Sequence, residues 1–163
     1  MATRLQTIQT SQGPVAVRQS GGTGLPLVLL HGNSLGMDVF ERQFDSPLAS
    51  RYRLVAIDLP GHGASGDARD PFSAYTLPGY AATVIEVLAA LDIESAAFFG
   101  WSLGGHVALE VATRWPGVAG VLVCGAPPAS PSPQGLMEAF APNPAFPLVG
   151  KQWLEESEMA LFA

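Results

Sequence analysis

The sequence predicts an α/β fold: a mostly parallel sheet with helices on both faces and antiparallel first strands. Three observations support this. Short apolar runs alternate with longer stretches of helical periodicity, a tight turn joins the first two strand-like segments, and no internal repeat interrupts the order. Strand–helix–strand units of this kind pair their strands in parallel through right-handed crossovers. The 163 residues suffice for one domain that buries roughly two-thirds of its unfolded surface.

The chain opens with two segments, residues 4–8 and 15–17, in which apolar and polar residues alternate. Gly13-Pro14 lies between them and is typical of a turn. A connection this short joins antiparallel neighbours, so the two segments are expected to form an antiparallel edge of the sheet.

The later strands are predicted from continuously apolar runs, which are typical of strands buried on both faces. Apolar residues at helical spacing follow, most clearly in residues 80–91, for which Thr76 is the expected N-cap. Pro116-Gly117 ends the helical stretch that begins at Ser102. The predicted strands are 27–30, 54–57, 96–99 and 118–123, and the predicted helices are 38–48, 80–91 and 102–115.

The composition changes at Ala126. Residues 126–150 are so rich in proline that no regular element is expected there. Residues 151–162 have a helical pattern in which apolar and acidic residues mix, with the glutamates as a solvated face. We therefore expect a core at residues 1–125 and the start of a lid or cap segment at residues 126–163, with a tail as the alternative.

Composition and charge exclude several classes of function. The net charge is −6, the pI is about 4.8, and the few Lys and Arg are scattered, so no nucleic-acid partner is expected. No apolar run approaches the length of a membrane span, and no signal peptide is visible, so no membrane partner is expected either. The single Cys124, expected to be small and buried, fits a cytoplasmic location.

Charged residues make up only 13% of the chain, against about 25% in an ordinary soluble domain. Two explanations stay open at this point. Part of the surface is covered by polypeptide outside this sequence, or the composition is simply apolar and rich in alanine.

The strongest chemical signal is the G-x-S-x-G pentapeptide at residues 100–104. A predicted strand precedes it and a predicted helix follows. Such a turn holds the serine in a strained conformation with its hydroxyl exposed, and the helix N-terminus favours developing negative charge. Ser102 is therefore the candidate nucleophile.

A second glycine pattern, G-x-G-x-x-G at residues 61–66, matches the dinucleotide-binding fingerprint and follows a predicted strand. Its context argues against that function. No helix is expected to open there, because residues 67–78 contain two prolines and resemble a loop. Asp58, which precedes the pattern, is expected to shape the loop after its strand.

Three motifs at these spacings resemble the α/β-hydrolase superfamily. They are HG at 31–32, DLPGHGAS at 58–65 and GWSLGGH at 100–106, and the resemblance extends to about residue 128. It implies the α/β-hydrolase fold, of which this chain is the N-terminal portion. It also implies that the main-chain amides of Asn33 and Leu103 form the oxyanion hole.

More narrowly, residues 31–34, 99–106 and 125–128 are similar to N-acyl-homoserine lactonases of α/β-hydrolase type. That similarity implies attack by Ser102 on a lactone carbonyl, with no metal and no cofactor. Gly32 and Trp101 are then expected to bind substrate, although a packing role for Trp101 is an equal alternative.

The chain departs from the family pattern after the nucleophile. The family places a carboxylate and then a histidine later in the sequence, whereas this chain ends 61 residues past Ser102. Its histidines, at 31, 62 and 106, all lie inside the motifs above. The acid and the histidine are therefore expected from the C-terminal half of the same protein or from a second copy.

The resulting hypothesis is a metal-independent serine hydrolase of small esters or lactones, with N-acyl-homoserine lactone favoured. It would act through an acyl-enzyme on Ser102, and this chain alone would be inactive. One alternative is a catalytically incomplete fragment or ligand-binding module on the same fold. Another is a general carboxylesterase or a cofactor-free haloperoxidase-like hydrolase.

Overall fold

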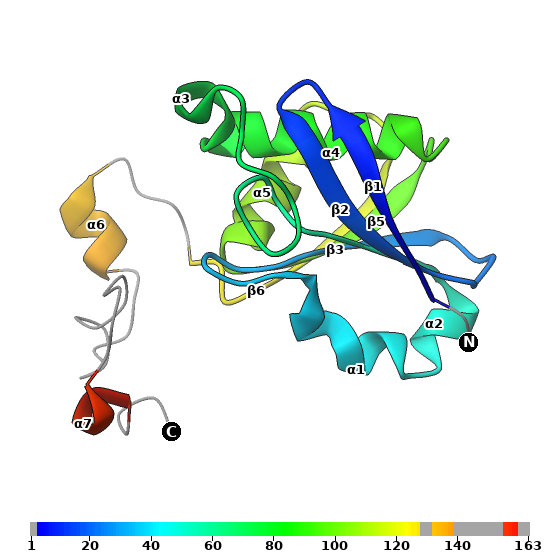
Figure 1. Cartoon of the computed structure of the whole chain (residues 1–163), viewed down its shortest axis with the longest axis horizontal. Helices are drawn as coiled ribbons and strands as arrows, with labels where there is room; N and C mark the ends of the chain where they lie inside the picture. The colour runs from blue at the N-terminus through cyan, green and yellow to red at the C-terminus, as the bar shows by residue number, and fades with distance from the viewer. Residues whose placement is uncertain (1–2, 128–131, 139–154, 160–163) are drawn as a thin grey trace. The chain divides into compact units, whose positions relative to one another are not determined.

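The computed structural model describes residues 3–127, 132–138 and 155–159. Six strands form one sheet in the order β1-β2-β4-β3-β5-β6 (Figure 1). β1 and β2 pair antiparallel, β2 joins β4 antiparallel, and all remaining pairs are parallel, which confirms the predicted fold class. The strands are β1 (Thr3–Thr10), β2 (Gly13–Ser20), β3 (Pro26–Leu30), β4 (Arg53–Ile57), β5 (Ala96–Trp101) and β6 (Val118–Cys124).

The helices cover the two faces of the sheet unequally. The two long helices α4 and α5 lie on one face, and a chain of short helices lies on the other (Figure 1). The helices are η1 (Met37–Phe40, a 3₁₀ turn), α1 (Glu41–Phe44), α2 (Leu48–Arg51), α3 (Pro71–Ala74), α4 (Leu77–Ala90), α5 (Leu103–Ala112), α6 (Pro133–Glu138) and α7 (Glu156–Met159).

Alternation along the strands divides the core into two clusters, because successive strand residues point to opposite faces. Val28 and Leu30 belong to the cluster under α4 and α5, where Val84 and Val107 are fully buried. Leu29, between them, belongs to the smaller cluster under η1, α1 and α2. β3 and β4 are therefore buried on both faces, as predicted, whereas the equally apolar β6 is mostly exposed.

The parallel register brings the carboxyl ends of the central strands together. Leu30 at the end of β3 is level with Ile57 at the end of β4 and with Gly100 near the end of β5. The segments that begin immediately after these strands therefore meet at one edge of the sheet, where ligands of open α/β sheets bind.

Three element predictions need correction. The predicted helix 38–48 is broken into η1, α1 and α2, because the helical turns stop before Pro47 and restart after it. Residues 67–78 contain one helical turn, α3, with Pro71 at its start and Asp70 accepting the Phe72 N–H at 3.2 Å. Residues 126–150 include the short helix α6, which begins at Pro133. Proline is tolerated best at the first position of a helix.

Other elements agree with the predictions. α4 begins after Thr76, whose hydroxyl accepts the Gly79 N–H at 3.1 Å. Part of the predicted helix 151–162 is present as α7, and its remaining residues except Glu155 lie outside the described ones. Glu155 and Glu156 are exposed. No described helix is long and apolar enough to cross a membrane.

β6 lies at the edge of the sheet. Its Leu122 side chain is 64% exposed, and Cys124 is exposed rather than buried, which corrects the expectation from its residue type. The reason is that, among the described strands, β6 has a neighbour on one side only.

The chain divides into two compact units, Met1–Ala126 and Pro127–Ala163. The first contains the sheet and all the residues predicted to form the site. The lid role of residues 126–163 stays a prediction.

Candidate functional site

Ser102 occupies a sharp turn between β5 and α5. Its φ of 53° and ψ of −118° lie far from the conformations that a residue with a side chain prefers. The turn is fixed on both sides, since the Ser102 N–H donates to the Cys124 carbonyl at 2.8 Å and the Gly105 N–H donates to the Ser102 carbonyl at 2.9 Å. Strain of this kind persists only where the surrounding structure imposes it, and it gathers at functional sites.

The glycines of the pentapeptide are required by close packing of main chain on main chain. A Cβ on Gly100 would lie 2.3 Å from the Gly104 carbonyl oxygen. A Cβ on Gly104 would lie 2.1 Å from the carbonyl oxygen of Leu30, at the end of β3. α5 can therefore approach β3 and β5 only with glycine at these positions, and this approach forces the turn at Ser102.

The loop after β3 lies directly against the nucleophile turn. A Cβ on Gly32 would be 3.3 Å from the Cβ of Ser102. Next in the loop come Asn33, which is exposed, and Ser34, which has a φ of 59°. The Asn33 side-chain amide donates to the Ser34 hydroxyl at 3.2 Å. The structure thus places Gly32 against Ser102, in the same loop as the predicted Asn33.

Asn33 and Leu103 also line one cavity of about 530 Å³. Leu103 is the first residue of α5, so its N–H is among the four that a helix leaves without an intrahelical partner. The two residues predicted to hold an oxyanion therefore meet at one opening. The other lining residues are Pro60, Gly61, His62, Asp67, Tyr75 and Tyr80.

Two tyrosines and a histidine form an aromatic wall of this cavity that was not predicted from the sequence. Tyr75 and Tyr80 are stacked with ring centroids 6.1 Å apart, and His62 meets Tyr80 edge-on at 6.2 Å. Burial and the neighbouring Tyr75 both raise the pKa of Tyr80. Nothing in the sequence around Tyr75 and Tyr80 indicated that these side chains would line a cavity together with the segment after β3.

Trp101 packs against the turn that follows β6. Its indole nitrogen would lie 3.2 Å from a Cβ on Gly125, and Gly125 has a φ of 60°. The side chain is still 38% exposed. The packing alternative thus has direct support in the contact with Gly125, and a role in substrate binding stays a prediction.

His31 is held as a neutral ring by two main-chain partners. The Leu59 N–H can only donate, so Nε2 of His31 accepts it at 3.0 Å, and Nδ1 carries the proton toward the Gly32 carbonyl at 2.7 Å. Desolvation lowers the pKa of His31, with a smaller lowering from His62, against the raising effects of the Gly32 hydrogen bond and Asp58. With both nitrogens engaged, His31 connects loops and is unsuited to shuttle protons.

The other histidines also have positions set by the fold. Nδ1 of His62 lies 3.0 Å from the Pro60 carbonyl, and His106 lies on α5 one turn after Ser102. Within residues 3–127, 132–138 and 155–159, no hydrogen bond joins the Ser102 hydroxyl to a histidine or a carboxylate. In the same ranges, no three His, Cys, Asp or Glu side chains gather closely enough to hold a metal ion.

The glycine pattern at 61–66 forms a closed turn around Asp58. The Gly61 N–H donates to the Gly66 carbonyl at 3.0 Å, and the Ser65 hydroxyl donates to the Asp58 carbonyl at 2.6 Å. No helix begins within the turn. Because a dinucleotide fingerprint needs a helix N-terminus there, the structure argues against nucleotide binding, as the sequence did.

Residues 27–163 match the alpha/beta hydrolase family. The chain belongs to this family. Proteins similar to this chain have several different activities. The non-heme chloroperoxidase of Streptomyces lividans is 36% identical over 144 residues, which are 82% of this chain and 51% of that protein. The pimeloyl-acyl-carrier-protein methyl ester esterase of Xanthomonas oryzae pv. oryzae is 42% identical over 107 residues, 66% of this chain and 39% of that protein.

Solved structures include a lactonase with a very similar fold. A variant of the N-acyl homoserine lactonase AidH with bound N-hexanoyl homoserine has a TM-score of 0.88 and 37% identity, and the match covers 99% of this chain and 58% of that one. The chain thus spans between about two-fifths and three-fifths of the length of these three proteins.

Proposed function

We propose that the complete protein hydrolyses esters or lactones through an acyl-enzyme on Ser102. The observation that carries this proposal is the strained turn at Ser102, which lies against Gly32 on one side and the N-terminus of α5 on the other. The Ser102 hydroxyl attacks the carbonyl carbon, and the carbonyl oxygen takes the negative charge. The N–H groups of Asn33 and Leu103 donate to that oxygen.

The remaining steps require a general base and acid. A histidine accepts the Ser102 proton and returns it to the leaving alkoxide, so that the ester bond breaks and the acyl group stays on Ser102. Water, deprotonated by the same histidine, then releases the acid and restores the serine. No metal takes part in these steps. We propose that this histidine and its carboxylate partner lie outside residues 1–163.

Among substrates we propose N-acyl-homoserine lactone first. The support is the likeness to AidH, which has been solved with N-butanoyl homoserine, and in a serine-to-glycine variant with N-hexanoyl homoserine lactone. The first ligand has an opened ring and the second a closed one. A serine that opens the ring would account for that difference, and Ser102 is the candidate for this role in the present chain.

The partner that we propose is the C-terminal half of the same protein. Support comes from β6, whose far side has no neighbour among the described strands, and from an apolar groove of about 590 Å³ beside it. Leu27, Phe99 and Leu122 line this groove. A second copy of the chain is the alternative occupant, and the molecular mass of the purified protein in solution distinguishes the two.

We infer a cytoplasmic location from the single cysteine.

A different hydrolytic or haloperoxidase-like activity is the second candidate function. The relatives at 36% and 42% identity, a chloroperoxidase and a methyl ester esterase, specifically favour it. A third candidate is a binding module that keeps the cavity at Asn33 and lacks turnover. It predicts lactone binding without ring opening.

The first test is covalent labelling. A fluorophosphonate probe should label the complete protein at Ser102, and Ser102→Ala should abolish the label. Ser50→Ala, at an exposed serine on α2, is the control and should label normally. Labelling that persists in Ser102→Ala would refute the nucleophile.

The second test is substrate preference. N-Hexanoyl homoserine lactone should yield the ring-opened acid at the same rate with and without a chelator. Loss of activity on chelation with recovery on adding zinc would contradict the metal-independent mechanism. Rapid cleavage of p-nitrophenyl acetate without lactone turnover would favour the general esterase.

A further inference from the structure

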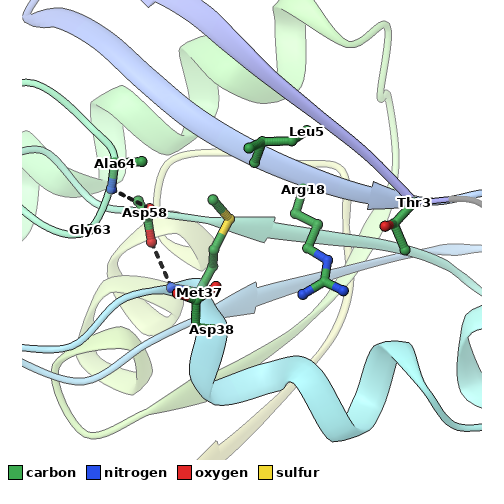
Figure 2. Close-up of a pocket in the computed structure, with 8 residues that line it drawn as sticks. All are labelled: Thr3, Leu5, Arg18, Met37, Asp38, Asp58, Gly63 and Ala64. Carbon is green, nitrogen blue, oxygen red and sulfur yellow. Dashed lines mark hydrogen bonds between the residues drawn. The ribbon is translucent and has the colours of Figure 1, made fainter.

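Asp58 is a buried carboxylate that the proposed chemistry does not use. It directly follows β4, and only 2% of it is exposed. Figure 2 shows its two oxygens bonded to main-chain donors from different loops: Oδ1 accepts the Met37 N–H at 2.6 Å and Oδ2 accepts the Ala64 N–H at 2.8 Å. Charged acceptors make stronger hydrogen bonds than neutral ones, so both loops are held firmly.

The loop of residues 32–36 is consequently anchored at both ends. At its start, His31 accepts the Leu59 N–H at 3.0 Å. At its end, Met37 donates to Asp58. Asp58 and Leu59 are consecutive, so one point at the end of β4 holds both ends of the loop that carries Asn33.

Glycines shape both loops around the carboxylate. A Cβ on Gly36 would lie 3.1 Å from Asp58 Oδ1, and a Cβ on Gly63 would lie 2.2 Å from Oδ2. Gly63 also has a φ of 54°, which favours glycine. The main chain thus closes around Asp58: a side chain at position 63 does not fit, and one at position 36 would press on Oδ1.

We propose that Asp58 is a positioning residue for the oxyanion donor at Asn33. This inference rests on the proposed function, in which the Asn33 N–H binds the charged oxygen. A donor must be held within about half an ångström of its productive place, and residues 32–36 lie beyond the end of β3, where strand pairing no longer restrains them. The bonds of Asp58 and His31 supply that restraint.

The experiment compares Asp58→Asn with Asp38→Asn in the catalytically complete protein. The amide introduced by Asp58→Asn can accept only one of the two N–H groups and presents its own N–H₂ to the other, so position 58 no longer holds both loops. Asp38 and Asp58 both line a cavity of about 470 Å³ (Figure 2). Asp38 is exposed, and its side chain makes no hydrogen bond within the described residues. Its variant therefore removes the same charge without touching the anchor.

For Asp58→Asn we expect kcat on p-nitrophenyl acetate to fall about 10- to 100-fold, because a misplaced donor loses most of its effect on the transition state. KM should change by less than about threefold, since the donor acts mainly on the transition state. The inhibition constant of phenylboronic acid, which forms a tetrahedral adduct with the serine, should rise by a factor similar to the fall in kcat. Asp38→Asn should match the unsubstituted protein in all three.

Gly36→Ala provides a second variant that keeps the Asp58 charge. Its Cβ would press on Oδ1, and we expect a fall in kcat and a loss of boronic acid affinity of about two- to tenfold. If Asp58→Asn fails to fold, Gly36→Ala tests the positioning role of Asp58. Unchanged kcat and boronic acid affinity in Gly36→Ala would then overturn the proposal, as would a folded Asp58→Asn protein that loses only thermal stability.

The Asn33 amide resonance separates this inference from the proposed function. We expect it to shift in Asp58→Asn and to stay in place in Asp38→Asn, whatever reaction the protein performs. An unmoved resonance in both variants would overturn the positioning role. Turnover that persists in Ser102→Ala would overturn the proposed function and leave the resonance result to judge the anchor.

Discussion

The two faces of the sheet are covered to different extents. Under α4 and α5, side chains such as Val28, Phe98 and Val107 are at most 1% exposed. On the opposite face, η1, α1 and α2 cover β4 and part of β3, and the apolar groove lies open over β5 and β6. This contrast shows where the chain is self-sufficient. The nucleophile turn is held by hydrogen bonds among the described residues, including one to Cys124 at the end of β6, whereas most of β6 and the groove beside it are exposed.

The largest expected effect is at the nucleophile turn. Ser102→Ala should lower turnover by roughly 10⁶-fold, as loss of the nucleophile does in the serine protease subtilisin. The thermal unfolding temperature should stay nearly unchanged, because the main-chain bonds of the turn do not involve the hydroxyl. Steady-state rates and a melting curve check both parts. Residual activity of a tenth or more would contradict the mechanism.

Two glycines compare the covered and the open regions directly. Gly104→Ala places a Cβ 2.1 Å from a β3 carbonyl oxygen and should cost about 3 kcal/mol or more of unfolding free energy. Gly120→Ala, on the open face of β6, meets nothing within 4 Å and should change the unfolding free energy by less than about 0.5 kcal/mol. Denaturant titration measures both. Equal costs would show that the region around Gly120 is already tightly covered.

The open region should make residues 1–163 associate when produced alone. An exposed edge strand offers unpaired N–H and C=O groups to other chains. Leu122→Lys, at a side chain 64% exposed on that edge, should reduce the association. Light scattering and size-exclusion chromatography measure this, and no turnover is expected from the isolated chain. A monomer with measurable hydrolysis would show that the base lies within these residues.

The smallest effect is a pH dependence of stability that arises from His31. Its pKa is lowered below the ordinary 6.5 mainly by desolvation, with Asp58 and His62 as the facing titratable groups. His31 therefore binds a proton more readily in the unfolded chain than in the folded chain. Stability from this group is complete above pH 6.5 and declines as the pH falls below it, with a slope of at most about 1.4 kcal/mol per pH unit.

Chemical denaturation at several pH values from about 5 to about 8, which bracket the ordinary histidine pKa, checks this dependence. His106→Gln is the control and should keep the slope, because His106 takes no part in the bonds between the loops. His31→Gln should flatten it. A slope that survives in His31→Gln would assign the dependence to other groups.

Much of the architecture followed from local pattern. β3 and β4 were predictable because burial on both faces produces continuous apolar runs, and α4 because Thr76 caps a regular apolar stripe. The single helix predicted at 38–48 is instead a series of short helical turns, and their buried side chains join the core cluster of Leu29 and Leu54. Cys124 was expected to be buried from its residue type, but its exposure depends on which strand lies beside β6.

For the site, local sequence was enough to specify the turn at Ser102, since glycine spacing at 100–104 indicates a close approach that few other arrangements need. It also placed Gly32 and Asn33 after a neighbouring strand. The folded chain alone shows that Asp58 and His31 anchor the Asn33 loop from a single point, and that Tyr75 and Tyr80 face the same cavity. What could and could not be predicted differs in how far apart along the sequence the interacting residues lie. Backbone conformation is specified by adjacent residues, whereas these contacts join segments that come together only when parallel strands align their ends.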